Sequence, residues 1–539
     1  MTHIEGAAPP GFRRGRTVGI VGILTLVVAI FGYLREAVLA ARFGVSSIMD
    51  AYFGAVSIPT ILYLLLIAGT LSPIFIPILL QQSGTSDRAK ASETFSVITN
   101  FVVLLLAGII VLAVTAAPVW LPLLFPGFSA ATLRMAVHLT YIVFPAMLFL
   151  ALTGILTSVL NGFHQFALAS FAPVVASAIV IATALLASGE RAIYVVGIAT
   201  AAGFLAQCLL LVPAVAALGI RYRPILNLRH PSIRTLLRLG VPLLLYLSVA
   251  NVAVFLERNL ASRLTAGAVS ILAYAMKLFT VPANFFAAPL AIVAYPQFAH
   301  EAVREGHGEL REKVSRVFRL VVFLFLPVTM FTVLNALPIT RFLYEHGRFS
   351  PQDSLITARA LALYGTGILP NAIAIVLLRC FFAIQDTVTP LWAEVLNVGF
   401  YVIVATVMVR HFGIPGLAIA RGVSFFPATA ILMFVLSNRR GLLKLDLDFL
   451  GFLWRCLAAT LGMGMAAWMS LRLLQSLFDG GNALFRLGII LTVLLTSGSI
   501  FLMLARLLHL DEARQILDAA RDLISGSRDN GPLIAPPDL

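Results

Sequence analysis

The sequence predicts an all-α integral membrane protein with about 14 transmembrane helices, arranged as two six-helix lobes and two further C-terminal helices. Composition is the first reason: 60% of the 539 residues are hydrophobic, only 12% are charged and the mean hydropathy is +0.98. Soluble globular chains are about 45–50% apolar and about 25% charged. Long apolar runs and an internal repeat are the other two reasons. A soluble, disordered or disulfide-stapled chain is therefore excluded.

The individual spans follow from the rule that a helix needs roughly 20 mostly apolar residues to cross a hydrocarbon core of about 30 Å. The apolar runs lack the two-residue alternation of transmembrane β-strands, so each of them predicts a helix. The predicted spans lie near residues 17–41, 51–80, 95–117, 135–159, 168–188, 192–217, 236–256, 266–299, 317–338, 357–381, 389–409, 413–437, 449–471 and 485–508.

The distribution of charge predicts the orientation and accounts for most of the net charge of +14. Lysine and arginine gather in the N-terminus, in every second loop and in the C-terminus, and the positive-inside rule places these parts in the cytoplasm. Nucleic-acid binding is therefore not needed to explain the basic composition, and membrane lipids are the expected surroundings. The first span is too long for a signal peptide and is expected to remain as an uncleaved anchor.

The spans and loops divide the chain into six predicted parts. They are a cytoplasmic basic N-terminus (1–16), an N-lobe (17–217), a cytoplasmic basic linker (218–235), a C-lobe (236–437), two added spans (438–508) and a cytoplasmic tail (509–539).

Prolines recur at a nearly constant spacing, which predicts that the two lobes are copies of one repeat. The corresponding residues are Pro59 with Pro282, Pro73 with Pro296 and Pro145 with Pro370. The spacing covers an even number of spans, so both copies share one orientation and a pseudo-two-fold axis should run along the membrane normal. Because proline frees a backbone carbonyl and kinks a helix, these positions are predicted to shape a substrate path. The alternative is that they only curve the helices around packing neighbours.

The sequence contains no enzyme motif and no metal-ligand pattern. It has no GxxxxGK[ST] loop, and His300-Glu301 is not followed by the second histidine of a zinc protease motif. Cys208, Cys380 and Cys456 lie in apolar runs without metal-binding spacing and are predicted to be core residues. We therefore expect a transporter without a cofactor, for which coupling to the membrane potential or to an ion gradient stays open.

Charged residues at membrane depth are the candidate functional groups, because each costs roughly 2.5–3.5 kcal/mol at the bilayer centre. Lys277 lies near the middle of span eight and is predicted to face a wet cavity, with a buried ion pair as the alternative. Arg35 is either a substrate contact or a structural anchor. Glu36 lies about 100° around the helix and is not expected to face Arg35. Asp50 is most simply explained as the N-cap of span two.

Two further cations lie within predicted spans, Arg379 and Arg421. Arg379 and Glu394 lie on either side of the turn near Asp386, and an antiparallel hairpin would bring them to similar depth. We therefore predict a structural ion pair between Arg379 and Glu394.

Short motifs spread over most of the chain carry a family resemblance. They are G-Y-L-R-E at 32–36, D-A-Y-F at 50–53, A-G-T-L-S at 68–72, N-G-F-H-Q-F at 161–166, Y-A-M-K-L at 274–278, Y-E-H-G-R-F at 344–349 and Q-D-T-V-T-P at 385–390. Together they resemble the MurJ/MviN family of lipid II flippases in the MOP exporter superfamily, whose fourteen spans agree with the predicted number. The resemblance implies a protein of the bacterial cytoplasmic membrane that moves an undecaprenyl-pyrophosphate-linked glycan, such as peptidoglycan lipid II, from the inner to the outer leaflet. It also implies a cationic cavity between the lobes, and a lipid-tail groove formed with the last two spans.

The sequence departs from the family pattern at several charged positions, which implies a divergent member. Arg35 matches a cavity arginine of the family, and Lys277 replaces another arginine while keeping its charge. Ala29 and Tyr63 stand where the family usually has arginine, and Ala68 replaces an acidic residue. The alternatives are a flippase for another polyprenyl-linked oligosaccharide, such as an exopolysaccharide or O-antigen unit, an ion-coupled exporter of small cations, or a transport-dead scaffold that recruits envelope-synthesis proteins. The candidate substrate-binding residues are Arg35, Glu36, Asp50, Tyr63 and Lys277, and the candidate structural or gating residues are Pro59, Pro73, Pro282, Pro296, Arg379 and Glu394.

Overall fold

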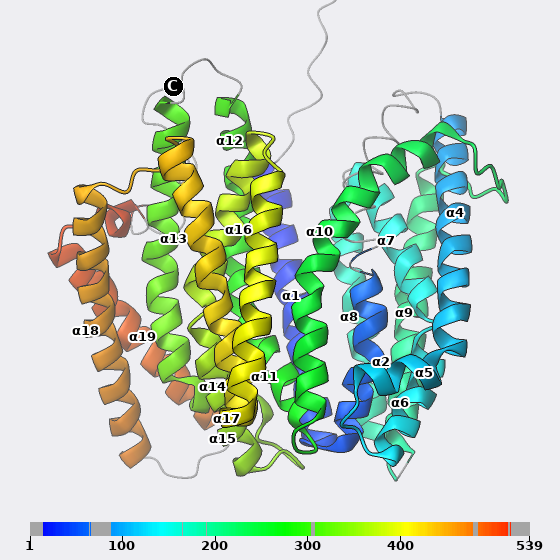
Figure 1. Ribbon diagram of the computed structural model, residues 1–539, viewed down its shortest axis with the longest axis horizontal. Helices are drawn as coiled ribbons and strands as arrows, with labels where there is room; N and C mark the ends of the chain where they lie inside the picture. The colour runs from blue at the N-terminus through cyan, green and yellow to red at the C-terminus, as the bar shows by residue number, and fades with distance from the viewer. Residues whose placement is uncertain are drawn as a thin grey trace, which may run out of the picture. The chain divides into compact units, whose positions relative to one another are not determined.

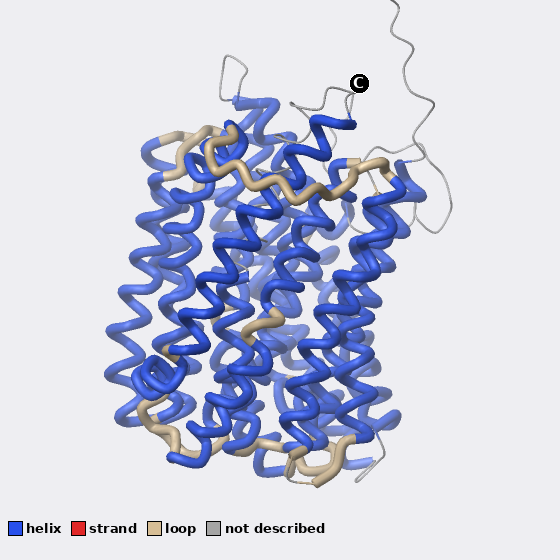
Figure 2. The backbone as a smooth tube through the Cα atoms, turned by 90° about the vertical axis from the view of Figure 1, so that its right-hand side faces the viewer, coloured by secondary structure: helices blue, strands red, loops and turns tan. Residues whose placement is uncertain are grey.

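Helices joined by short loops make up the part of the chain that the structure describes, and no strand occurs in that part (Figure 2). The structure is a computed structural model that describes residues 14–63, 65, 88–163, 165–189, 191–302, 308–477, 483–515 and 518. The predicted all-α class is confirmed. Left-handed glycines follow the ends of several helices, such as Gly44 after residue 43 and Gly219 after residue 217.

The chain forms two compact units, and the main division between them falls inside α10 (Pro231–Ser262), at Ser248 and Val249. The second unit also includes the short segments Gly44–Ser46 and Phe125–Gly127. Figure 1 labels α10. The predicted linker 218–235 lies just before this point, and α10 continues from it without a break. The observed division, at Ser248 and Val249, therefore lies later in the chain than the predicted linker, which ends at residue 235.

The first unit is built around α8 and α9, against which α1 and α7 pack, while α2 packs against α6. Its helices are α1 (Arg14–Phe43), α2 (Ser47–Tyr63), α4 (Arg88–Thr115), α5 (Ala117–Leu124), α6 (Ala130–Val143), α7 (Met147–Gly162), α8 (Phe166–Leu186) and α9 (Ala192–Ala217).

The second unit is built around α13, α15, α16 and α17. Its helices α18 and α19 pack against each other, and α18 also packs against α13 and α19 against α14. Its helices are α11 (Ala268–Pro282), the π-helix η2 (Ala283–Ala287), α12 (Ala288–Ala302), α13 (Gly308–Leu334), α14 (Ala336–Tyr344), α15 (Pro351–Gly365), α16 (Ile368–Ala383), α17 (Val388–Phe434), the π-helix η3 (Val435–Arg439), α18 (Leu447–Leu477) and α19 (Ala483–Leu507).

The same bent helix pair occurs once in each unit. In the first unit α6 and α7 meet at an angle of 43°, with Pro145 in the break. In the second unit α15 and α16 meet at 45°, and Pro370 lies in the first turn of α16. Because proline lacks an N–H to donate, it favours a break on its N-terminal side. The matching bends support the predicted internal repeat, while the symmetry axis stays a prediction.

The helix α17 is a helical hairpin. Gly413 has φ 58° and ψ −128°, values that are not helical and that glycine adopts without strain. Tyr401 and Arg421 lie on opposite sides of this glycine and would be about 30 Å apart on a continuous helix. The Arg421 guanidinium instead lies 5.5 Å from the centre of the Tyr401 ring, so the two halves of α17 run side by side (Figure 1).

Within the described part of the chain, nine helices are long and apolar enough to cross a membrane, or up to eleven when the two bent pairs are each taken as one span. That number takes the α17 hairpin as one helix, whereas the sequence predicts two spans there, 389–409 and 413–437. Two further predicted spans, 51–80 and 236–256, include positions outside the described residues and side chains. The total of about 14 therefore stays a prediction.

A row of side chains on α4 fixes the path of the irregular segment 218–230, which leads from α9 to α10 (Figure 1). The backbone N–H groups of Arg221 and Arg223 donate to the hydroxyls of Ser92 and Ser96, at 3.1 Å and 2.9 Å. One turn further along α4, the Asn100 amide donates to the carbonyls of Arg223 and Ile225, at 3.3 Å and 2.9 Å. Spacing by four residues places the three α4 side chains on one face of the helix.

Candidate functional site

The second unit contains a buried polar cluster formed by α10, α15 and α17. Its members are Glu257 and Arg258 of α10, Tyr364 of α15, and Glu394, Asn397, Tyr401 and Arg421 of α17. We call this set the Glu257–Arg421 cluster. On α17, residues 394, 397 and 401 recur at helical spacing and share one face, and the hairpin at Gly413 returns Arg421 to the same depth.

Two carboxylates of this cluster lie within the electrostatic field of Arg421. Glu257 is 6% exposed and interacts electrostatically with Arg421 and with Arg258. Glu394 also lies within the electrostatic field of Arg421. The fully buried Tyr401 hydroxyl donates to Glu257 Oε2 at 3.5 Å. A buried carboxylate without a nearby cation would be costly, so the cation accounts for the burial of both acids.

Aromatic rings hold Arg421 in place from two sides. Its guanidinium carbon lies 5.5 Å from the centre of the Tyr401 ring and 5.4 Å from the centre of the Phe425 ring. Phe279 of α11 stacks on Phe425 at 6.0 Å. Rings within about 6 Å of a cation attract it electrostatically and exclude water from one of its faces. The aromatic contacts therefore fix Arg421 without using its hydrogen-bond donors.

Several polar atoms of the cluster have no hydrogen-bond partner within the described part of the protein. They are Nε and Nη1 of Arg421 and Oδ1 of Asn397. Buried polar atoms are nearly always paired, so free donors beside free acceptors indicate room for water or for the oxygen atoms of a ligand. The arrangement can bind a small polar or anionic group at a guanidinium that is already positioned.

The predicted ion pair between Arg379 and Glu394 is wrong. Glu394 accepts a hydrogen bond from Asn397 at 3.2 Å and lies in the field of Arg421, and no contact joins it to Arg379 among the described residues. An antiparallel hairpin brings two residues to similar depth, but their rotation about each helix axis decides whether they face one another. Arg379 lies half-buried on α16.

The first unit pairs Arg35 and Glu36 of α1, whose side chains the sequence predicts to point apart. Nη2 of Arg35 lies 2.7 Å from Oε1 of Glu36, and the Glu36 side chain is only 8% exposed. The long arginine side chain bends across the 100° between neighbouring positions, because a buried carboxylate needs a cation nearby. Nε of Arg35 and Oε2 of Glu36 have no hydrogen-bond partner in the described structure. The pair therefore retains a donor and an acceptor for a further polar group.

Neighbouring helices extend this polar region of the first unit. Tyr52 of α2 interacts electrostatically with Arg35, and its hydroxyl lies 3.0 Å from Oγ1 of Thr200 on α9. Asp50 lies buried in the first turn of α2, which begins at Ser47, so the N-cap position falls at Ser46 and the predicted N-cap role of Asp50 is wrong. A carboxylate in the first turn is still stabilised by the positive end of the helix dipole.

The other predicted site residues lie on separate elements. Lys277 is half-buried on α11, where its carbonyl accepts a hydrogen bond from the Thr280 hydroxyl at 2.9 Å. Tyr63 is the last residue of α2 and is half-buried. Pro59 lies buried within α2, α11 gives way to η2 at Pro282, and Pro296 lies exposed within α12. Pro73 lies outside the described residues.

Glu257 is the main site residue that the sequence does not predict. The predicted span seven ends at residue 256, one position before it, so Glu257 and Arg258 were assigned to a loop. α10 continues to Ser262 and keeps both charges inside the unit. An acid and an arginine directly after a long apolar run are the signal that could have indicated a buried pair.

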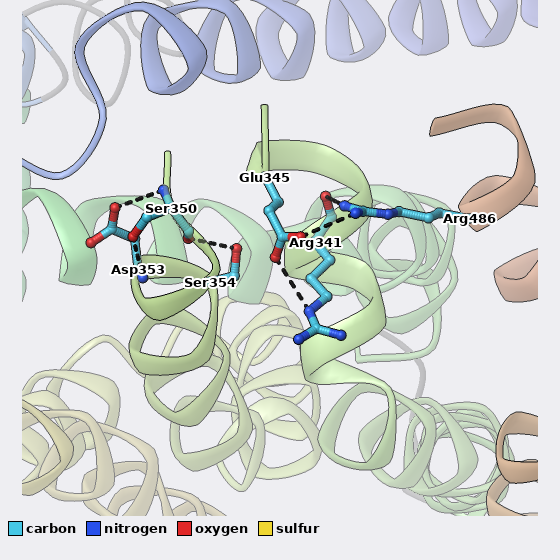
Figure 3. A network of polar contacts seen from close by, with 6 residues as sticks. All are labelled: Arg341, Glu345, Ser350, Asp353, Ser354 and Arg486. Atoms are coloured by element: carbon cyan, nitrogen blue, oxygen red, sulfur yellow. Dashed lines mark hydrogen bonds and ion pairs between the residues drawn. The ribbon is translucent and has the colours of Figure 1, made fainter. Parts of the chain in front are cut away.

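Glu345 belongs to the motif at 344–349 and joins α14 to α19 through an ion-pair network (Figure 3). Glu345 lies 3.2 Å from Nε of Arg341 and 3.1 Å from Nη2 of Arg486, and Arg486 also donates to the Arg341 carbonyl at 3.3 Å. Beside it, Ser350 and Asp353 form a capping box that begins α15. We call Arg341, Glu345 and Arg486 the Glu345 clip.

The turn between α16 and α17 is held by Asp386. Its carboxylate accepts hydrogen bonds from the backbone N–H and hydroxyl of Thr389, at 3.0 Å and 2.9 Å, and from Arg440 at 2.9 Å. Burial by itself would raise the pKa of Asp386, but the hydrogen bonds from Thr389 and Arg440 outweigh it and hold the pKa below its usual range. The Q-D-T-V-T-P motif is therefore a structural turn outside the spans.

No group of three or more histidine, cysteine, aspartate or glutamate side chains in the described ranges could hold a metal ion. The two polar regions, one in each unit, are candidates for binding polar or anionic groups, because Arg35 and Arg421 keep donors without a partner in the described structure.

Comparison with known proteins adds a family match over most of the chain. The family model described as "Lipid II flippase MurJ" matches residues 39–488. The lipid II flippase MurJ of Burkholderia cenocepacia is 27% identical over 470 residues, covering 85% of this chain and 90% of that protein. A probable lipid II flippase MurJ of Rhizobium meliloti is 29% identical over 465 residues, covering 84% and 85%.

Solved structures give the same fold. A lipid II flippase MurJ in an inward closed conformation matches with a TM-score of 0.75 and 22% identity, covering 90% of this chain and 98% of that chain. A multidrug resistance MATE family transporter of the MOP superfamily, in an inward-facing conformation, matches with a TM-score of 0.63 and 15% identity, covering 78% and 98%.

Proposed function

Because the chain belongs to the MurJ family of lipid II flippases, we propose that it moves peptidoglycan lipid II from the inner to the outer leaflet of the bacterial cytoplasmic membrane. The family match over residues 39–488 is the observation that carries this proposal. The protein acts as a transporter without a cofactor, and the membrane potential or an ion gradient supplies the energy. The termini lie in the cytoplasm, in agreement with the positive-inside distribution of arginine and lysine.

The charged residues of both units support the transport of a pyrophosphate-linked sugar. A pyrophosphate group needs cations and hydrogen-bond donors to leave water, and arginine supplies both in a fixed planar arrangement. Arg35 and Arg421 each keep donors without a protein partner in the described structure. Lys277 adds a half-buried cation on α11. Each unit could therefore offer positive charge to the head group while apolar helix faces remain for the polyprenyl tail.

The proposal is tested by complementation of a strain depleted of its own lipid II flippase. Expression of the full chain should restore growth, and Lys277→Ala should abolish the rescue because a cation for the pyrophosphate is lost. Lys444→Ala removes an exposed lysine of the loop before α18 and serves as the matched control, with growth retained. Absence of rescue by wild-type protein that is present in the membrane would overturn lipid II as the cargo.

Two uncharged positions, Ala29 and Tyr63, favour a second cargo, which is another polyprenyl-linked oligosaccharide. Ala29 of α1 and Tyr63 of α2 carry no charge where the family resemblance leads one to expect arginine, and part of the charge of Arg35 is taken up by Glu36. A lipid-linked oligosaccharide with a different head group would need a different set of cations. Mass spectrometry of lipids that copurify with the protein distinguishes the two cargoes by mass, and envelope-synthesis proteins in the same purification would identify its partners.

A further inference from the structure

A groove of about 540 Å³ lies in the first unit between α4 and α9, which both pack against α7. This volume is within the range of about 300–1,000 Å³ that is usual for small-molecule sites. The groove is separate from the polar region around Arg35 and Tyr52, because none of those residues lines it. Its deeper walls are apolar and include Val103 of α4, Ile155 of α7, and Cys208 and Val212 of α9.

The groove is apolar at one end and polar at the other. The polar end is formed by Thr99 and Asn100 of α4 together with Arg221 and Tyr222 of the segment that leaves α9. The Tyr222 hydroxyl donates to Oδ1 of Asn100 at 2.7 Å, while the rest of the ring is largely exposed. Tyrosine with a wet tip and an apolar body is typical of the membrane–water interface. The polar end is therefore at interface level and the apolar end reaches into the hydrocarbon.

One buried hydroxyl at this end has no partner. Thr99 is 6% exposed, and its Oγ1 makes no hydrogen bond within the described structure. A threonine on a helix usually donates to the carbonyl four residues earlier, as Thr153 and Thr200 do here. Because buried hydroxyls are rarely left unpaired, Thr99 indicates a ligand or water oxygen in the groove.

Positive charge surrounds the polar end. Arg221 lines the groove and is exposed, and Arg223 and Arg229 follow it on the same exposed segment. Basic residues at interface level attract anionic lipid head groups, and basic pockets between transmembrane helices bind them specifically. The order along the groove is thus cation, hydroxyl and hydrocarbon, which is also the order of phosphate, ester and acyl chain in a glycerophospholipid.

We propose that this groove binds an anionic glycerophospholipid, with its phosphate at Arg221, an ester carbonyl at the Thr99 hydroxyl and one acyl chain between α4 and α9. The groove follows α9 from Ala216 to Cys208, which is roughly 12 Å along the helix axis. That length fits within one leaflet, about half of a hydrocarbon core of about 30 Å. A polyprenyl tail would extend far beyond it, so a phospholipid is the better occupant.

Native mass spectrometry of the delipidated full-length protein, titrated with phosphatidylglycerol or phosphatidylethanolamine, tests the proposal. Phosphatidylglycerol should bind more tightly, because its phosphate charge is not offset by an ammonium group as in phosphatidylethanolamine. Arg221→Gln should weaken the binding of phosphatidylglycerol about fivefold and that of phosphatidylethanolamine by less. Val212→Trp fills the groove and should abolish the binding of phosphatidylglycerol. Val195→Trp is the matched control, because Val195 lies on the same helix with 43% exposure against 45% for Val212 but does not line the groove.

A second measurement needs no substitution. Cys208 is buried but lines the groove with 5% exposure, whereas Cys380 and Cys456 have 0% exposure, lie elsewhere and serve as internal references. Phosphatidylglycerol should slow the alkylation of Cys208 by a small thiol reagent, as read by peptide mass mapping. This result decides the matter if Val212→Trp fails to fold.

Three outcomes would overturn the proposal. They are equal affinity for the two phospholipids, unchanged alkylation of Cys208 with phosphatidylglycerol, and stronger protection of Cys208 by undecaprenyl phosphate than by phosphatidylglycerol. Neither measurement involves transport, so the lipid site and the flippase function can fail independently.

Discussion

Arg421 is the residue on which the Glu257–Arg421 cluster depends, because it is the cation shared by Glu257 and Glu394. Replacing it by leucine would leave Glu394 without its cation and Glu257 with Arg258 alone, in a low-dielectric region. We expect Arg421→Leu to lower the free energy of unfolding by about 3 kcal/mol, measured by denaturation in detergent. Arg410→Leu, at an exposed position of the same helix, should change it by less than about 0.5 kcal/mol. Equal stability of the two variants would contradict the role given to Arg421.

Residue chemistry in the sequence identifies which charges are unusual but not which of them meet. Arg35, Lys277, Arg379 and Arg421 stand out because each interrupts an apolar run. The partner of Arg421 on α10 could not be found this way, because contact depends on how the hairpin of α17 packs. The pairing of Arg35 with Glu36 depends on side-chain length, since an arginine reaches its sequence neighbour even when their Cβ atoms point apart.

At the level of elements, the second half of α17 approaches the α15–α16 bend so closely that only glycine fits. A Cβ at Gly422 would lie 2.4 Å from Oγ1 of Thr366 and 2.5 Å from the carbonyl oxygen of Leu363. We expect Gly422→Ala to destabilise the protein by about 1–3 kcal/mol through overpacking, measured as a lower melting temperature. Gly399→Ala on the first half of α17 should have no such effect, because its Cβ would meet nothing within 4 Å. A neutral Gly422→Ala would show that the bend can relax.

The length of the apolar runs predicts that these helices exist, but the sequence predicts only some of the points at which they are interrupted. Proline marks both bent pairs because its chemical effect on the backbone is local. The reversal at Gly413 has a weaker signal, since a single glycine in an apolar run is compatible with a continuous helix. The predicted span 413–437 nevertheless begins at this glycine, after the span 389–409 has ended.

At the level of the whole molecule, the Glu345 clip attaches the last helix to the body of the second unit. The two arginines are 42% and 33% exposed and Glu345 is 12% exposed, so we expect Glu345→Gln to cost about 0.5–1 kcal/mol. Amide hydrogen exchange at the start of α19 should become faster, because Arg486 loses its anion. Glu312→Gln breaks an ion pair within α13 only and should leave exchange in α19 unchanged. Identical exchange in both variants would exclude the clip as the attachment.

The family, the all-α class and the membrane environment are all predictable from the sequence, because composition and motifs report on the chain as a whole. The sequence predicts the division between the two units in the linker 218–235. The division falls inside α10, because a helix can continue through a boundary between two packed bodies. Hydropathy cannot detect that boundary, since it describes how apolar a segment is and not which helices the segment packs against.

The row of Ser92, Ser96 and Asn100 has a consequence for how the segment after α9 can evolve. Only alternate residues of that segment, 221, 223 and 225, present their backbone to α4. An insertion or deletion of one residue between 221 and 225 would exchange the outward-facing set for the inward-facing one beyond the change and misalign the bonds there, whereas a change of two residues would keep the parity. A stretch that counts as a loop by its irregular backbone thus tolerates changes in length only in even steps.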